Sequence, residues 1–323
     1  MLGASNSWRL LLAALILLAV LLAATGALVA LLVSLTAIDL REDYVAVVEL
    51  SGAIDYSYGG LFSGPVITPH SVETLVERVL SDPRARAVVI VVNSPGGTAA
   101  AFEVYEILRK LYEERVVVVY ITGLGASGGY LISLPSHAIV AHPTAIVGSV
   151  GAIGILVSYK ELLDKLGIDA EVVVSGDLKD FASPFKEIES EDVELLSRII
   201  RDVADYFVSL VEKHRGDRIT DWREVMRAGV YSGYEAKKLG LVDYVGTLED
   251  AVRIARELAE LPEDAPVVKI RKEPSLLELL MGFSSSKPEV VKRDVLSVEI
   301  LVMWPLPREL PQALVISVTP GPG

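Results

Sequence analysis

The chain has 323 residues, no cysteine, 51% hydrophobic residues and a formal net charge of -13. This length allows one large domain or two small ones around a sizeable core. The absence of cysteine excludes disulfides, thiolate metal sites and cysteine nucleophiles. The acidic balance disfavours binding to nucleic acid, because it repels phosphate backbones.

Amide side chains are rare in this chain. Asn6, Asn93 and Gln312 are the whole set, whereas charged residues are abundant. Few thermolabile residues together with many charges are typical of thermophilic proteins. We therefore predict a thermophilic source.

The first segment that stands out is an uncharged run over residues 10–38, between Arg9 and Asp39. A spanning helix needs roughly 20 apolar residues, whereas the apolar region of a signal peptide usually has only about 7–15. The run therefore predicts an uncleaved transmembrane anchor after a short N-terminal segment, residues 1–9. Positive charges near the run hardly distinguish its two ends. We prefer a single-pass protein of the cell membrane with the main domain outside.

From Tyr44 onwards, apolar strands alternate with amphipathic helices. The predicted strands are Val45–Leu50, Ala87–Val92, Val116–Thr122, Ala138–Ala141 and Ala145–Val147, and the predicted helices among them are Ser71–Leu80, Ala100–Tyr112 and Ser127–Ser133. Such alternation is typical of an α/β fold whose parallel sheet is covered on both faces.

The second half of the chain is mostly helical in pattern. The predicted helices are Ser190–His214, Asp221–Ala228, Tyr234–Leu239 and Thr247–Leu258. In the first of these, an apolar stripe predicts one buried face; it consists of Leu195, Ile199, Val203, Phe207 and Val211. Prolines crowd the end of the chain, so we expect a partly extended or disordered tail, residues 276–323, after a domain over residues 44–275.

The most informative stretch is GLGASGGY, residues 123–130, which follows a predicted strand and opens a helix. It matches the G-x-G-x-x-G of dinucleotide-binding loops, which also need an acidic residue about 20 positions later. No Asp or Glu lies between Arg115 and Lys160. The same stretch matches the G-x-S-x-G nucleophile elbow around Ser127, but that machinery needs a late histidine. The last histidine is His214, at a helix end where a cation is the simpler interpretation.

Two interpretations of Ser127 stay open on the residues alone. One is a glycine-rich turn with a capping serine, and the other is a nucleophile with a lysine base. Free N–H groups at a helix start suit a developing oxyanion. A second glycine loop, NSPGG at residues 93–97, also follows a strand and precedes a helix. Because ligands of parallel sheets bind at the carboxyl ends of the strands, we expect both loops to meet at one site.

Taken together, these segments resemble the signal peptide peptidase A family, the membrane-bound Ser/Lys proteases of peptidase family S49 with a ClpP/crotonase-like fold. The matching segments are Val91–Gly97 (VVNSPGG), Gly125–Tyr130 (GASGGY), Ile139–Gly154 (IVAHPTAIVGSVGAIG), Gly176–Pro184 (GDLKDFASP) and Gly229–Gly246 (GVYSGYEAKKLGLVDYVG). Their order and spacing match over about residues 44–260. The chain departs from the family at Ser136 and His137, where an Ala-Asp pair is common.

The resemblance implies a role for individual residues. Ser127 corresponds to the nucleophile, Lys179 to the general base, and Ser149 to the hydroxyl that helps to hold the lysine amine. The glycines that correspond to oxyanion donors are Gly96, Gly97 and Gly128.

A free lysine is protonated at neutral pH, so a lysine base has to be desolvated before it can accept a proton. Asp177 and Asp180 flank Lys179 and would oppose this. Their carboxylates must therefore point away from the amine.

The resemblance also implies how the protein works as a whole. We expect neither a cofactor nor a metal ion, and we expect a homo-oligomeric ring, commonly an octamer, in which the Ser and Lys of one site come from adjacent subunits. The substrates would be signal peptide remnants and other apolar peptides near the membrane.

Three alternatives remain beside this prediction. One is a ClpP-like membrane protease that processes stomatin-type partners, although in those proteases the interval from Ser to Lys is shorter. The others are a crotonase-like acyl-thioester enzyme and a catalytically dead membrane scaffold. The membrane anchor and the pair of Ser127 and Lys179 disfavour the second, and the presence of both residues with Ser149 disfavours the third.

Overall fold

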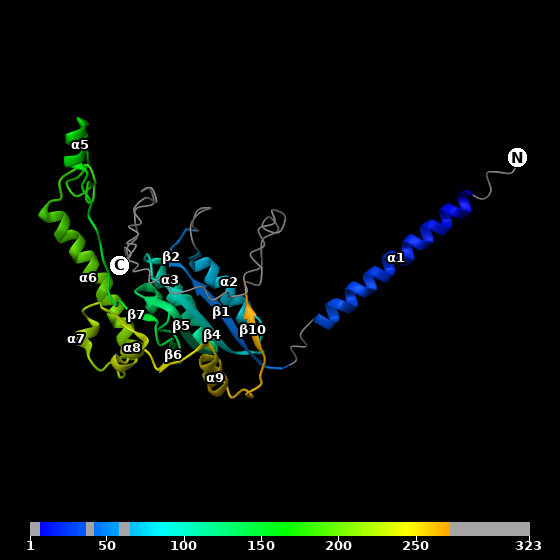
Figure 1. Ribbon diagram of the computed structural model, residues 1–323. Coiled ribbons are helices and arrows are strands. Elements are labelled where there is room, and N and C mark those ends of the chain that lie inside the picture. The colour runs from blue at the N-terminus through cyan, green and yellow to red at the C-terminus, as the bar shows by residue number, and fades with distance from the viewer. Residues whose placement is uncertain (1–6, 37–41, 58–64, 272–323) are drawn as a thin grey trace, which may run out of the picture.

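The computed structural model describes residues 7–36, 42–57 and 65–271 (Figure 1). In the first helix, the side chains of residues 14–28 are described. The predicted tail over residues 276–323 lies outside the described residues.

The first helix, α1 (Ser7–Thr36), covers most of the uncharged run. Among the described residues, no helix is both long and apolar enough to cross a membrane. The structure therefore does not support the transmembrane helix predicted over residues 10–38.

A largely parallel sheet forms the centre of the domain (Figure 1). Its main path runs β10-β1-β4-β5-β6-β9, and every neighbouring pair on this path is parallel. These strands are β1 (Tyr44–Ser51), β4 (Ala85–Ser94), β5 (Val116–Ala126), β6 (Ala138–Ala141), β9 (Tyr244–Val245) and β10 (Val267–Ile270). The predicted α/β architecture with a parallel sheet is confirmed.

Four short strands complete the described sheets. The strand β7 (Ile146–Gly148) pairs in parallel with the end of β5 and antiparallel with β8 (Val230–Ser232). A separate two-stranded sheet joins β2 (Ala53–Ile54) to β3 (Val66–Ile67). The strand β7 therefore lies beside the last residues of β5, directly before the glycine-rich turn.

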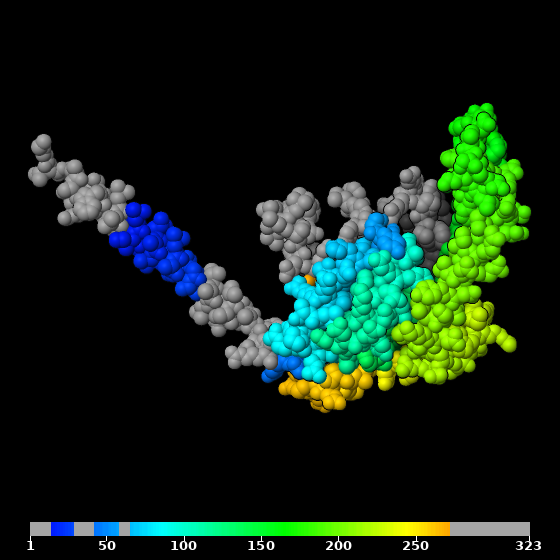
Figure 2. Space-filling model, turned by 180° about the vertical axis from the view of Figure 1, so that it is seen from behind, coloured from blue at the N-terminus to red at the C-terminus, as the bar shows by residue number. Residues whose placement is uncertain are grey.

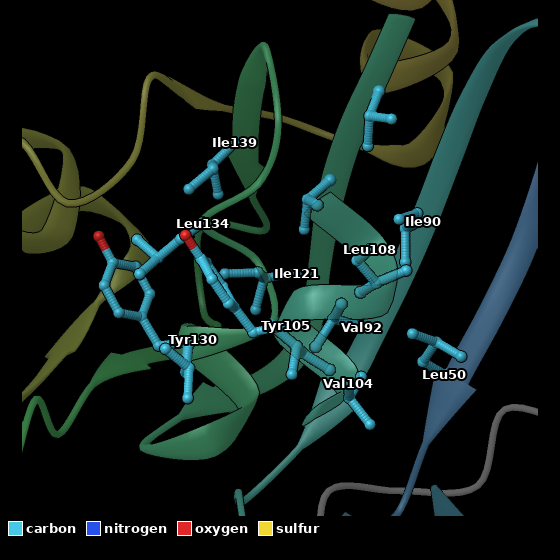
Figure 3. Packing of buried hydrophobic residues seen from close by; sticks show 14 of the residues in the cluster. Leu50, Ile90, Val92, Val104, Tyr105, Leu108, Ile121, Tyr130, Leu134 and Ile139 are labelled. Carbon is cyan, nitrogen blue, oxygen red and sulfur yellow. The ribbon is translucent and has the colours of Figure 1, made fainter. Parts of the chain in front are cut away.

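The two faces of the main sheet have separate hydrophobic cores. Val48 and Ile90 lie in the core that is covered by α2 (Pro69–Leu80) and α3 (Ala100–Glu114); Figure 3 shows the side chains of this core converging from β4, β5 and α3. Their chain neighbours Val47 and Val89 lie in the other core, together with residues of α9 (Leu248–Leu258). Burial on both faces explains why the central stretches of β1 and β4, residues 45–48 and 87–92, are apolar.

The remaining helices are α4 (Gly128–Leu131), α5 (Lys160–Leu166), α6 (Ser190–Arg215), α7 (Trp222–Val225) and α8 (Gly233–Leu239). Each predicted helix and strand of the domain is present, with ends that differ by a few residues. The exceptions in length are the helices predicted over residues 127–133 and 221–228, of which only α4 and α7 form. The sequence did not predict α5, β2, β3, β8, β9 or β10, because each of them is too short to show a period.

Residues 151–200 form an arm that projects from the domain, with α5 at its tip and the first part of α6 along it (Figures 1 and 2). Apolar side chains on the arm are exposed, including Leu162, Leu166, Val173, Leu178 and Phe185. The predicted stripe of α6 is therefore only partly buried. Phe207 and Val211 lie in the core, whereas Ile199 is 44% exposed and Val203 is 37% exposed.

Candidate active site

Ser127 lies at the junction between β5 and α4, in a backbone conformation that is rare for a serine. Its φ is 51° and its ψ is -123°, a strained combination that costs on the order of 1–3 kcal/mol. Its N–H donates to the carbonyl of Gly148 at 2.8 Å, which ties the junction to β7. Although Ser127 is at the N-cap position of α4, its hydroxyl makes no capping hydrogen bond. The interpretation of Ser127 as a capping serine is therefore wrong.

The loop over residues 93–97 packs directly against this junction. Gly96 has a φ of +94°, and a Cβ on it would lie 2.6 Å from the nitrogen of Gly128 and 2.9 Å from the Cβ of Ser127. Only a glycine accepts both this backbone conformation and this close approach. The two glycine loops thus meet at one place, as the parallel sheet predicted.

The backbone N–H groups at this meeting point are not equivalent. That of Gly96 donates to the hydroxyl of Ser94 at 3.1 Å. Among the hydrogen bonds of the described residues, none uses the N–H of Gly97 or of Gly128 as donor. The nitrogen of Gly97 would lie 3.4 Å from a Cβ on Gly128, so two free donors lie close together beside Ser127. Of the three predicted donors, Gly97 and Gly128 are therefore favoured over Gly96.

Asn93 and Ser94 support the site in ways that the sequence prediction missed. The pairing of β4 with β5 shifts after Val92, and Ser94 pairs with Gly125. At this irregularity the side-chain oxygen of Asn93 accepts the N–H of Leu124 at 3.1 Å. Asn93 thus connects the ends of the two strands that carry the glycine loops. Its position in the NSPGG loop of a chain nearly without asparagine was the available signal.

Ser149 follows β7 and also has a positive φ, 54°. Its N–H donates to the carbonyl of Gly229 at 2.6 Å. Because Ser127 is hydrogen-bonded to the preceding residue, Gly148, the two serines lie on neighbouring strand ends.

Lys179 lies apart from these residues, exposed in a turn on the arm. The backbone N–H of Lys179 donates to the carbonyl of Gly176 at 2.9 Å. Within the described ranges, no ion pair or side-chain hydrogen bond involves its amine. One chain therefore brings together Ser127, Ser149 and the glycines, and leaves Lys179 on the projecting arm.

His214 is not a cation at a helix end, as the sequence suggested, but a packed aromatic residue. Its Nε2 lies 2.9 Å from the hydroxyl of Tyr105, and its ring packs against Tyr112. Burial, together with the charges of Lys213 and Arg215, lowers the pKa of His214 from 6.5 to about 4. It is therefore neutral near pH 7. In the part of the chain that the structure describes, no cluster of acidic and histidine side chains is arranged to hold a metal ion.

Comparisons with known proteins place the chain in a family. The model of peptidase family S49 matches residues 109–262. A putative protease of Methanocaldococcus jannaschii is 38% identical over 256 residues, which are 76% of this chain and 82% of that protein. The chain belongs to peptidase family S49. By this membership it is a serine peptidase.

A further relative and a solved structure are also similar to this chain. A putative signal peptide peptidase of Enterococcus faecium is 30% identical over 236 residues, covering 72% of this chain and 66% of that protein. A variant of the 1510-N membrane-bound stomatin-specific protease has a solved structure that covers 72% of this chain and all of its own, with 14% identity and a TM-score of 0.45.

Proposed function

We propose that this serine peptidase is an endopeptidase with a Ser/Lys dyad, which degrades cleaved signal peptides and other apolar peptides. The observation that carries the proposal is the position of Ser127. Its hydroxyl is free of capping bonds, and the unused N–H groups of Gly97 and Gly128 lie close together beside it. A nucleophile next to two convergent donors is the arrangement that acyl transfer needs.

In the proposed mechanism, the neutral amine of Lys179 takes the proton of the Ser127 hydroxyl while the Ser127 oxygen attacks the peptide carbonyl. The carbonyl oxygen becomes an oxyanion, which accepts hydrogen bonds from Gly97 and Gly128. The C–N bond then breaks, and the ammonium of Lys179 returns the proton to the leaving amine. An acyl-enzyme on Ser127 remains.

Water completes the cycle. The neutral amine of Lys179 accepts a proton from water as the water oxygen attacks the ester carbon of the acyl-enzyme. When the ester bond to Ser127 breaks, the proton passes to the serine oxygen. The acid is released and both side chains are restored.

The proposed dyad is assembled between subunits. Lys179 is exposed on an arm whose apolar side chains stay exposed among the described residues, as for Val173 at 89% exposure. Large exposed apolar patches are typical of interaction surfaces. A neighbouring copy would cover the arm of this chain. Lys179 of this chain would then lie at the Ser127 of the neighbouring copy, next to the Ser149 of that copy. A closed ring of identical copies satisfies this contact for every subunit.

Two inactive variants test the dyad and its assembly together. Ser127→Ala and Lys179→Ala should each reduce cleavage of an apolar fluorogenic peptide to background, while melting temperatures stay unchanged. A mixture that is assembled from both variants should recover activity, because some sites then combine an intact Ser127 with an intact Lys179. The matched control is Lys165→Ala, an exposed lysine on α5 of the same arm. Appreciable cleavage by either dyad variant alone would exclude the assignment.

A second experiment concerns the substrate. Synthetic signal peptides and a peptide from a stomatin-type protein are compared at equal concentration. Preferred cleavage of the signal peptides supports the proposal, and preferred cleavage of the stomatin peptide supports the alternative protease. Labelling of Ser127 by a fluorophosphonate separates both from a crotonase-like enzyme or an inactive scaffold, which stay unlabelled.

The proposed location at the cell membrane, with the catalytic domain outside, depends on the uncharged run over residues 10–38 in the sequence. Carbonate extraction of membranes and protease accessibility in intact cells test it. Release of the full chain by carbonate would argue against it.

A further inference from the structure

A partly buried cluster of charges lies next to the exposed lysine of the proposed dyad. Lys186 is on the arm, between Lys179 and the start of α6, and its side chain is only 20% exposed. Its Nζ contacts the carboxylate of Asp180 at 3.1 Å and that of Asp192 at 3.1 Å. One ammonium therefore joins the residue that follows Lys179 to the first turn of α6.

Each partner of Lys186 is itself fixed. The other oxygen of Asp192 accepts the N–H of Glu189 at 3.0 Å, which closes the capping box of α6. That hydrogen bond, with a contribution from Lys186, lowers the pKa of Asp192 despite its burial. On the opposite side, the hydroxyl of Ser158 donates to the carbonyl of Lys186. The loop from Asp180 to α6 is thus held to both α6 and the residues before α5.

The same contacts act on the charge next to Lys179. A free carboxylate on Asp180 would favour the protonated amine of Lys179, which is the form that cannot act as a base. In the structure, Asp180 is directed to Lys186, and Lys179 has no ion pair within the described residues. Burial opposes the charged form of Lys186, but the carboxylates of Asp192 and Asp180 outweigh it and raise the pKa of Lys186.

We propose that Lys186 is a positioning residue for the general base, which holds the carboxylate of Asp180 away from Lys179 and fixes the Lys179 turn against α6. This inference rests on the proposed role of Lys179 as base. Lys186 would be the residue that makes a lysine between two aspartates suitable as a general base.

Other charged groups near the Lys179 turn also contribute to the pH dependence of this region. On the same turn, the carboxylate of Asp177 accepts the N–H of Leu178 at 3.1 Å. Across the arm, Lys160 of α5 pairs with Asp164 at 3.0 Å, and Glu187 and Asp169 lie near Lys160. Of the lysines in this region, only Lys186 is paired with an aspartate next to Lys179.

The test is the pH dependence of kcat/KM, measured with the full chain and an apolar fluorogenic peptide. Lys186→Met should move the acid limb of the profile to higher pH by about half a unit, because a unit charge a few ångströms away across water changes a protonation equilibrium by about that much. Asp180→Asn should move the limb to lower pH by a similar amount. The double variant should return it close to that of the wild type, and Lys186→Arg should leave it in place.

Lys160→Met is the matched control, because it removes the other ion-paired lysine of the arm without touching Asp180, and it should not move the limb. If Lys186→Met fails to fold, since it leaves Asp192 buried without its partner, the shift of Asp180→Asn decides alone. An unmoved limb in Asp180→Asn, or in a folded Lys186→Met, overturns the inference. If Lys179→Ala is inactive and the limb is unmoved, only the role of Lys186 fails; if Lys179→Ala is active, the proposed function fails first.

Discussion

The two parts of the proposed dyad lie in regions of opposite character. The neighbours of Ser127 belong to the core, where Ala126 and Tyr130 have no exposed surface. Lys179 lies on the arm, where Leu166 is 64% exposed and Val173 is 89% exposed. Among the described residues, the core beside Ser127 therefore buries its apolar side chains within one chain, whereas the arm leaves many of its apolar side chains exposed. In the proposed enzyme, folding alone prepares the nucleophile, and assembly adds the base.

The largest effect is expected where the glycine loops meet. Gly96→Ala would place a Cβ 2.6 Å from the nitrogen of Gly128, at a φ of +94°. We expect kcat/KM to fall by about 100-fold or more, the loss that follows when an oxyanion donor is displaced. The melting temperature should fall as well, because strain and overpacking add.

The matched control on the arm is Gly176→Ala. A Cβ on Gly176 would have no atom within 4 Å, so its melting temperature should not change. Kinetic assays and thermal unfolding measure both variants. Equal losses in the two variants would mean that the contrast between domain and arm is wrong.

The next effect concerns α6, which passes from the arm into the domain. Phe207 is 2% exposed and packs edge-on against Phe102, with ring centroids 6.4 Å apart. Phe207→Ala should lower the free energy of unfolding by about 3–5 kcal/mol. Ile199 on the same helix is 44% exposed, so Ile199→Ser should cost less than about 0.5 kcal/mol in a dilute, dissociated chain.

Ile199→Ser should nevertheless weaken assembly. Chemical unfolding at low protein concentration measures the free energy of unfolding. Sedimentation velocity at high concentration measures the extent of assembly. A cost for Ile199→Ser as large as that of Phe207→Ala would show that the arm packs within its own chain.

The smallest effect is a pH dependence of the domain. Burial lowers the pKa of His214 from 6.5 to about 4, so the folded chain binds fewer protons than the unfolded chain between these values. The free energy of unfolding should therefore fall as the pH drops from about 6.5 towards 4. His214→Gln should reduce this slope. Urea unfolding at several pH values measures it, and an unchanged slope in the variant would show that His214 is accessible to protons in the folded chain.

Much of the domain was predictable from local patterns. The apolar runs of β1, β4 and β5 predicted strands buried on both faces, and the two separate cores explain why the central residues of these strands are apolar. The meeting of the two glycine loops also followed from the sequence, because parallel strands end at the same edge of a sheet. The irregular pairing at Asn93 could not be predicted in this way, because a shift of register depends on both strands at once.

The sequence by itself determined the order of the longer strands and helices, the place of the glycine loops and the resemblance that singled out Ser127 and Lys179. The tertiary structure decided which N–H groups stay unused, that Ser127 does not cap its helix, and that part of the α6 stripe stays exposed. The physical reason is that periodicity shows that a face is apolar but not what will cover it. Burial, strain and free hydrogen-bond donors depend on segments that are far apart in the chain.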